Sequence, residues 1–169
     1  YVTTVFNNDR DNSAGMGIGT DSEYVETSDG KAIAVESVAA RYVRFYANGN
    51  SVNGYSHYVE IEVYGTATSV ALGKPISSSN SFSNSGSITD GNKLDTAAFA
   101  DSTPNQGLQW VQVDLQGVYD VNEIRLWHYY GDPRQYQDVI VQLSMDALFS
   151  ECVITVFNND RDNSAGMGI

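Results

Sequence analysis

The sequence contains one cysteine, Cys152, among its 169 residues. A single cysteine cannot form a disulfide within the chain or supply a cysteine cluster for zinc. No apolar run approaches the length of a membrane-spanning helix, and the first residues lack the charged-then-apolar layout of a signal peptide. We expect a secretion signal, if the parent protein has one, to lie outside this sequence. At this length, one domain can bury a sufficient hydrophobic core without disulfides.

Positive charge is also scarce. Nine Lys and Arg residues stand against 21 Asp and Glu, which gives a formal net charge of −12. Phosphate backbones and anionic lipid headgroups require clustered positive charge, so nucleic acid and acidic membranes are not expected partners. An excess of carboxylates most often marks a solvated, soluble surface, although it can also attract a divalent metal or a cationic polymer.

Catalytic motifs are missing. The chain has two histidines, His57 and His128, and it contains no Gly-x-Ser-x-Gly elbow, His-Glu-x-x-His pair or phosphate-binding loop. Its carboxylates fall in predicted strands and turns, and no pattern places two of them across a cleft. We therefore do not expect an enzyme.

The strongest internal feature is a repeat. Residues 1–18 read YVTTVFNNDRDNSAGMGI and residues 152–169 read CVITVFNNDRDNSAGMGI. The copies differ at two positions, Tyr1/Cys152 and Thr3/Ile154. A repeat this close indicates that the chain starts inside a module and finishes at the equivalent point of the same or a sister module.

The repeat predicts a single module, spanning residues 1–169, whose halves are circularly permuted. Residues 1–65 are then the C-terminal half of the natural order, and residues 71–169 are the N-terminal half. Residues 66–70 are small, polar and unpatterned, as expected for a junction between former termini. Permutation is tolerated where the original termini lie close together at the surface.

Period-two alternation of apolar and polar residues dominates the sequence, and no segment has a sustained helical period. The alternating segments lie at 43–47, 59–63, 111–115, 124–128 and 139–143. Clusters of Gly, Asn, Asp and Ser separate them, so we predict an all-β fold, an antiparallel β-sandwich or jelly roll. Trp110 and Trp127 fall in predicted strands, where we expect core or sheet-face positions.

Six segments, taken in natural order, carry a family resemblance. They are ALGKPISSS at 71–79, ITDGNKLDTAAF at 88–99, QWVQVDLQGVYDVNEIRLW at 109–127, DVIVQLSMD at 138–146, ARYVRFYANG at 40–49 and HYVEIEVYG at 57–65. Together they resemble the discoidin domain, also called the coagulation factor V/VIII type C domain, and in particular the bacterial family 32 carbohydrate-binding modules. This resemblance implies a galactose-binding-domain-like jelly roll in an extracellular or cell-surface protein. It also implies that loops at one end bind a ligand, often a terminal sugar, without naming that sugar.

The resemblance further implies a structural calcium ion. The family holds its metal with the Asp of an Asp-Gly turn, nearby carbonyls, a Thr and a Glu on the last strand, a set of oxygens that suits Ca²⁺. In this sequence the corresponding groups are Asp90, the carbonyls of Ser87, Asn92 and Val59, Thr96, and Glu60. One additional residue pushes Thr96 a step beyond the usual place, so Asp95 is an alternative ligand. Without the resemblance, a metal-free Asp-Gly turn beside an edge-strand Glu is the ordinary interpretation, and the resemblance favours the metal.

Sugar recognition requires an aromatic face and a few fixed polar groups. The candidate ligand-binding residues are Tyr55, His128, Tyr129, Tyr130, Arg134 and Asp101. The family commonly places a stacking aromatic at the position of Tyr55. Galactose-binding relatives carry an Arg near the position of Tyr129, so this sequence departs from the galactose pattern. The loop WHYYGDPRQYQD at 127–138 is crowded with further polar and aromatic groups, including Asp132 and Tyr136.

Structural interpretations stand beside these assignments. His128 alternates with Leu126 on an apolar face, so a buried, hydrogen-bonded histidine is an equal alternative. Tyr129 and Tyr130 could instead pack the loop onto the sandwich. The NNDRDNSAG segment has the composition of a tight polar loop that is structural rather than binding.

Two functions follow from the sequence. The first is a non-catalytic carbohydrate-binding module with a structural calcium, and the alternative is a discoidin-type protein-binding or adhesion domain. A lipid-binding role is disfavoured because the loops lack bulky apolar tips with basic neighbours. The repeat adds a further expectation. One copy fills its native position, and the other pairs at a sheet edge or enters a neighbouring chain, giving a strand-exchanged homo-oligomer.

Overall fold

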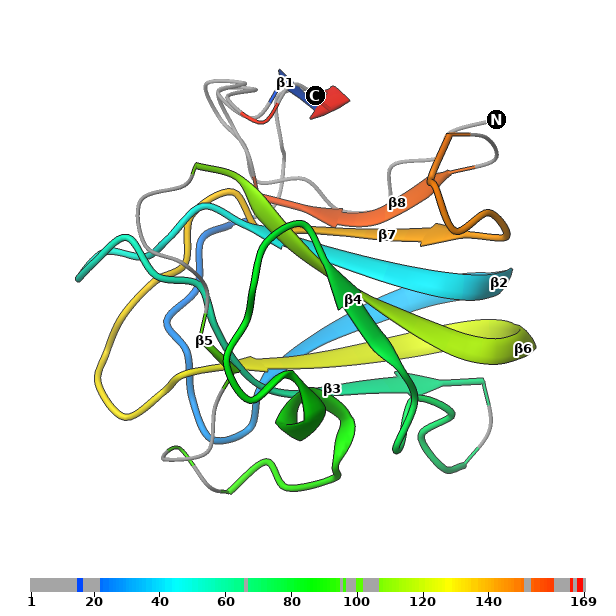
Figure 1. Cartoon of the computed structure of the whole chain (residues 1–169), viewed down its shortest axis with the longest axis horizontal. Coiled ribbons are helices and arrows are strands. Elements are labelled where there is room, and N and C mark those ends of the chain that lie inside the picture. The colour runs from blue at the N-terminus through cyan, green and yellow to red at the C-terminus, as the bar shows by residue number, and fades with distance from the viewer. Residues whose placement is uncertain are drawn as a thin grey trace.

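A computed structural model describes residues 15–16, 22–65, 67–94, 96, 100–101, 107–150, 153–159, 165 and 167–168. These residues form an antiparallel β-sandwich, as the alternation in the sequence predicts (Figure 1). The described part contains no α-helix, and its one helical element is a short 3₁₀ turn.

The elements follow the chain in a simple order. They are β1 (Gly15–Met16), β2 (Lys31–Ala47), β3 (His57–Tyr64), β4 (Ile76–Ser78), the 3₁₀ turn η1 (Ser85–Thr89), β5 (Ala100–Asp101), β6 (Gln109–His128), β7 (Ile140–Ser144), β8 (Ile154–Asn158) and β9 (Met167–Gly168). Neighbouring strands run in the order β5-β3-β6-β2-β7-β8, and β4 also pairs with β6. Strands β1 and β9 form a separate parallel pair.

The two long strands, β2 and β6, belong to both layers of the sandwich. Their antiparallel ladder is interrupted where the register shifts, next to Ser37 in β2 and Gln116 in β6. Both residues have a positive φ, 44° and 61° respectively. Bulges of this kind bend a strand and increase its twist. The first half of β6 therefore pairs with β4, while its second half pairs with β3.

The core comes from the alternating positions of these strands. Val43 and Phe45 of β2, and Val111 and Val113 of β6, have no exposed surface. Trp127 is also buried, and Trp110 lies half-buried on a sheet face, so both tryptophans occupy the kind of position predicted for them.

Strand β3 departs from simple alternation. Tyr58 and Ile61 both belong to the core, although three positions separate them. The ladder with β6 explains this, because its register shifts between Tyr58 and Glu60 and leaves Val59 as an additional residue. A bulge of one residue moves the following side chains to the opposite face. Residues 57–63 are all buried on both faces of β3, because the loop after η1 covers the face that does not point into the core.

The predicted junction is part of the ordered fold where the structure describes it. The backbone N–H of Val70 donates to the carbonyl of Val63, at 2.8 Å, and the Ser69 hydroxyl accepts a hydrogen bond from the Val63 N–H. Residue 66 lies outside the described residues, as does most of the first repeat copy. The permuted natural order therefore stays a prediction.

Candidate functional site

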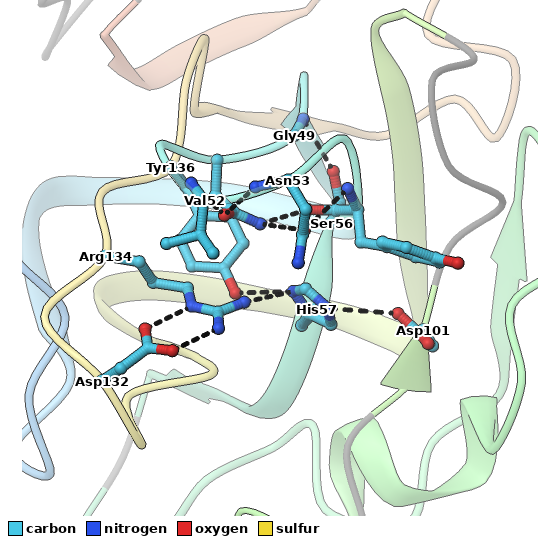
Figure 2. Close-up of polar contacts among 11 residues, drawn as sticks. Gly49, Val52, Asn53, Ser56, His57, Asp101, Asp132, Arg134 and Tyr136 are labelled. Carbon is cyan, nitrogen blue, oxygen red and sulfur yellow. Dashed lines mark hydrogen bonds and ion pairs between the residues drawn. The ribbon is translucent and has the colours of Figure 1, made fainter.

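A cluster of polar and aromatic side chains lies where β3 begins, beside β5 and the loop that follows β6. His57, the first residue of β3, is at its centre and is paired with Asp101 of β5. Figure 2 shows Arg134 and Tyr136 of the 129–139 loop approaching His57 on one side, and Asp101 on the other. Residues distant in the sequence are thus held together by two strands and a loop.

The His57 ring is almost completely buried and contacts three of these groups. Its Nδ1 lies 2.9 Å from the Tyr136 hydroxyl and 3.5 Å from the Arg134 guanidinium. Burial, together with the positive charge of Arg134, lowers the pKa of His57 to about 4, so the ring is neutral at pH 7. Both neighbours can donate to Nδ1, which leaves the proton on Nε2, facing Asp101 Oδ1 at 3.3 Å.

Arg134 is held by a carboxylate and a ring. Its guanidinium donates two hydrogen bonds to Asp132, at 2.6 and 2.5 Å, and it lies 4.5 Å from the centre of the Tyr129 ring. The Arg134 side chain is nearly buried, whereas Asp132 is partly exposed. This two-point fork fixes the guanidinium plane and lowers the pKa of Asp132.

Two half-buried tyrosine rings flank the histidine. Tyr55 stacks on His57 with centroids 5.6 Å apart and planes 29° apart. Tyr129 lies against His57 at 6.0 Å and 49°. Each ring therefore rests on a rigid neighbour and still presents part of its surface to solvent.

The loop that carries Tyr55 is organised by one asparagine. The Asn50 side chain donates to Asn53 Oδ1 at 2.9 Å and to the Tyr55 carbonyl at 2.7 Å. Its Oδ1 accepts hydrogen bonds from the N–H groups of Val52 and Asn53. A bridge between Asn50 and Tyr136 ties this loop to the 129–139 loop. Side-chain-to-backbone bonds of this type fix a turn that would otherwise have several conformations.

The structure brings most of the predicted ligand-binding residues together, namely Tyr55, Asp101, Tyr129 and Arg134. Tyr130 lies apart from them, and its hydroxyl donates to the Lys93 carbonyl at 2.7 Å.

His128 is placed differently. It has no exposed surface and sits behind the cluster, with its ring stacked on Tyr136 at 4.1 Å and its Nδ1 2.7 Å from Glu26 Oε1. This is the buried, hydrogen-bonded interpretation of His128. The buried side chain packs behind the cluster.

Some members of the cluster have little sequence signal. Asp132 and Tyr136 lie in the loop that the sequence marks as crowded, but the central residue, His57, is absent from the predicted set. Its signal was weak, because it stands at the start of an apolar strand, two residues after Tyr55.

The predicted calcium ligands form a second cluster around Glu60, further along β3. Glu60 is 1% exposed, and its Oε2 accepts a hydrogen bond from the Gly91 N–H at 3.1 Å. Burial, with smaller effects from Asp90 and Glu62, raises the pKa of Glu60 to about 8. A carboxyl group that is buried beside a second carboxylate is poorly stabilised as an anion, and a bound cation would relieve this.

Neighbouring groups fit the same interpretation in part. Val59 is the bulged residue of β3, and Ser87 and Asn92 lie on the segment that covers Glu60. Thr96 is half-buried, and Asp95 lies outside the described residues. Among the described residues, no group of three or more His, Cys, Asp and Glu side chains could hold a metal. A site here would therefore depend on the two carboxylates of Glu60 and Asp90, on the Thr96 hydroxyl and on backbone carbonyls.

No helix in the described part of the chain is long and apolar enough to cross a membrane. Comparison with family models, curated proteins and solved structures finds no match to this chain. The function therefore has to be argued from the site itself.

Proposed function

We propose that this chain is a non-catalytic carbohydrate-binding module of the discoidin type, part of an extracellular or cell-surface protein. The ligand binds at the end of the sandwich that carries His57. One observation carries the proposal: two half-buried tyrosine rings, Tyr55 and Tyr129, stand beside polar groups that the fold holds in fixed positions.

The arrangement suits a sugar for chemical reasons. A pyranose has an apolar C–H face, which an aromatic ring can cover, and hydroxyl groups, which require fixed donors and acceptors. Asp101 and Asp132 are partly exposed carboxylates that accept hydrogen bonds from hydroxyls. Because Asn50 and the Arg134 fork already order the loops, little conformational entropy is lost on binding.

The charge of the cluster restricts the sugar. Asp101 and Asp132 supply two carboxylates, Arg134 supplies one guanidinium that is already paired with Asp132, and His57 is neutral. No unpaired cation is therefore offered to an acidic sugar by these four residues. We expect neutral or amine-bearing glycans as ligands, and sulfated or carboxylated glycans to be excluded.

The Glu60 cluster is proposed to hold a structural Ca²⁺. The ligands would be Glu60, Asp90 and Thr96, with Asp95 as the alternative to Thr96, and the carbonyls of Val59, Ser87 and Asn92. When bound, the ion would neutralise the two carboxylates and fasten the loop after η1 to β3. Since β3 also begins with His57, this would stabilise the strand on which the candidate site is built.

A glycan array with calcium present tests the proposal. We expect the wild-type chain to bind one or more neutral or amine-bearing glycans, and Tyr55→Ala to lose that binding. Tyr42→Ala is the matched control, because Tyr42 is also half-buried but lies on β2 opposite Asp114 and Ser144. If no glycan binds, including chitosan-like cationic chains, the proposal is wrong and the protein-binding discoidin function takes its place.

A further inference from the structure

The strand position beside β7 is occupied by the second copy of the repeat. β8 runs antiparallel to β7, with Ile154 opposite Leu143 and Asn158 opposite Ile140. It is the last strand of the sheet in the described part of the chain, and Figure 1 shows it lying along β7. None of the residues of β8 belongs to the proposed sugar site.

The fully buried apolar contacts of this position come from residues that both copies share. Val156 and Phe157 have no exposed surface and belong to the main core. The Phe157 ring meets Tyr24 edge-on at 6.0 Å, and the Lys31 ammonium lies 5.6 Å from its centre. Val5 and Phe6 are the counterparts in the first copy.

The polar contacts are also shared. Gln142 Nε2 donates to the Thr155 hydroxyl at 2.9 Å, and the Asn159 N–H donates to the Val139 carbonyl at 2.7 Å. The Asn159 side chain accepts a hydrogen bond from the Val139 N–H and donates to the Tyr136 carbonyl at 3.2 Å. The first copy carries Thr4 and Asn8 at the same places.

One strand residue differs between the copies, and it is not fully buried. Ile154 is half-buried in β8, and its counterpart is Thr3. Exchanging isoleucine for threonine at such a position loses part of one apolar side chain. A loss of this size favours the second copy by about tenfold at most.

The ends of the two copies lie side by side. β1 and β9 pair in parallel, with Gly15 opposite Met167 and Met16 opposite Gly168. Met167 is the counterpart of Met16, so equivalent residues run in the same direction, offset by one position. Ala165, just before β9, packs against Tyr46 and Ile140 on the layer that contains β7. The chain therefore brings both copies to the same part of the fold.

We propose that the strand position beside β7 is a binding site for either copy, and that residues 3–8 of the same chain are its second occupant. The position holds one strand, so entry of residues 3–8 releases residues 152–159. The released segment stays attached to β7 through residues 145–151 and becomes accessible to solvent. Entry from within the chain is favoured because a tethered strand has an effective concentration in the millimolar range.

Serine substitutions at Phe6 and Phe157, singly and together, test this proposal. A buried phenylalanine truncated to a small side chain normally lowers Tm by about 10 °C or more in a protein of this size. We expect Phe157→Ser to lose much less than that, because the first copy replaces the damaged strand. Phe6→Ser should be silent by itself, and the double variant should lose the full amount. Phe45→Ser, at a buried and unduplicated position in β2, provides the reference for the full loss.

The decisive quantity is the further loss of Tm when Phe6→Ser is added to Phe157→Ser. If residues 3–8 cannot enter, Phe6→Ser has no effect in either background, and Phe157→Ser alone matches Phe45→Ser; that result overturns the proposal. Limited proteolysis with mass spectrometry supplies a second readout, since the 152–169 segment should become cleavable in Phe157→Ser. Sedimentation must show Phe157→Ser to be a monomer at micromolar concentration. A dimer would mean that the strand comes from a second molecule, which contradicts entry from the same chain.

Discussion

Replacing Glu26 by alanine should destabilise the protein more than any change at the exposed surface. The Glu26 carboxylate is fully buried, and its Oε1 lies 2.7 Å from Nδ1 of His128, which is also fully buried. His128 in turn stacks on Tyr136, and Tyr136 contacts His57. The pair therefore lies behind the candidate site and holds residues 22–30 against the end of β6.

The size of the stability loss follows from His128, which Glu26→Ala leaves buried without this carboxylate. Removing one partner of a buried pair strands the other polar group in the interior, which costs about 3–5 kcal/mol. Glu26→Gln keeps the shape and can still form a neutral hydrogen bond, so it should cost only about 1–2 kcal/mol. Replacing both residues by leucine restores an apolar interior and should cost less than Glu26→Ala.

Urea unfolding followed by circular dichroism measures these differences. Glu23→Ala is the matched control, since Glu23 is three residues away in the same segment and is exposed; it should change the free energy of unfolding by no more than about 0.5 kcal/mol. A loss below about 1 kcal/mol for Glu26→Ala would refute the reasoning, because it would mean that the buried contact contributes nothing beyond ordinary packing.

Further predictions concern the calcium cluster, the ligand and the arginine fork. In calcium-free protein the pKa of Glu60 is raised to about 8, so the protonated side chain stabilises the fold fully below about pH 4.5, and this stabilisation is lost as the pH rises through 8. The melting temperature should therefore fall between pH 5 and 8, and added Ca²⁺ should abolish that fall. An unchanged Tm after chelation of protein shown to be metal-loaded would contradict the calcium assignment. Tyr55→Ala should weaken glycan affinity in calorimetry at an unchanged Tm, whereas a large stability loss with unchanged affinity would identify Tyr55 as a packing residue. Arg134→Lys loses the two-point contact with Asp132 and should lower the free energy of unfolding in urea by about 1–2 kcal/mol. Arg125→Lys, at an exposed ion pair, should lower it by less than about 0.5 kcal/mol, and equal effects would show that burial of the Arg134 fork is irrelevant.

The strands could be predicted because their geometry appears directly in the sequence. A strand places alternate side chains on opposite faces, so the apolar residues of 43–47 and 111–115 mark the core face of β2 and β6. The bulge at Val59 could not be predicted, since apolar and polar residues alternate regularly in the sequence on its C-terminal side. Only the pairing with β6 shows that Tyr58 and Ile61 share a face.

The candidate site follows a similar division. Tyr55, Tyr129 and Arg134 lie in long polar loops, and composition alone marks such loops as places where function is carried. Asp101 belongs to the same predicted set, but its contact with His57 depends on the register between β3 and β5, which sets the two residues opposite one another. Register is fixed by the whole sheet and has no local signature in either strand. The neutral state of the His57 ring is even harder to predict from the sequence. It requires the burial of His57 in the sheet and the approach of Arg134 from the 129–139 loop. A histidine at the start of an apolar strand can thus become the centre of a binding site through pairings that its own neighbours in the sequence do not encode.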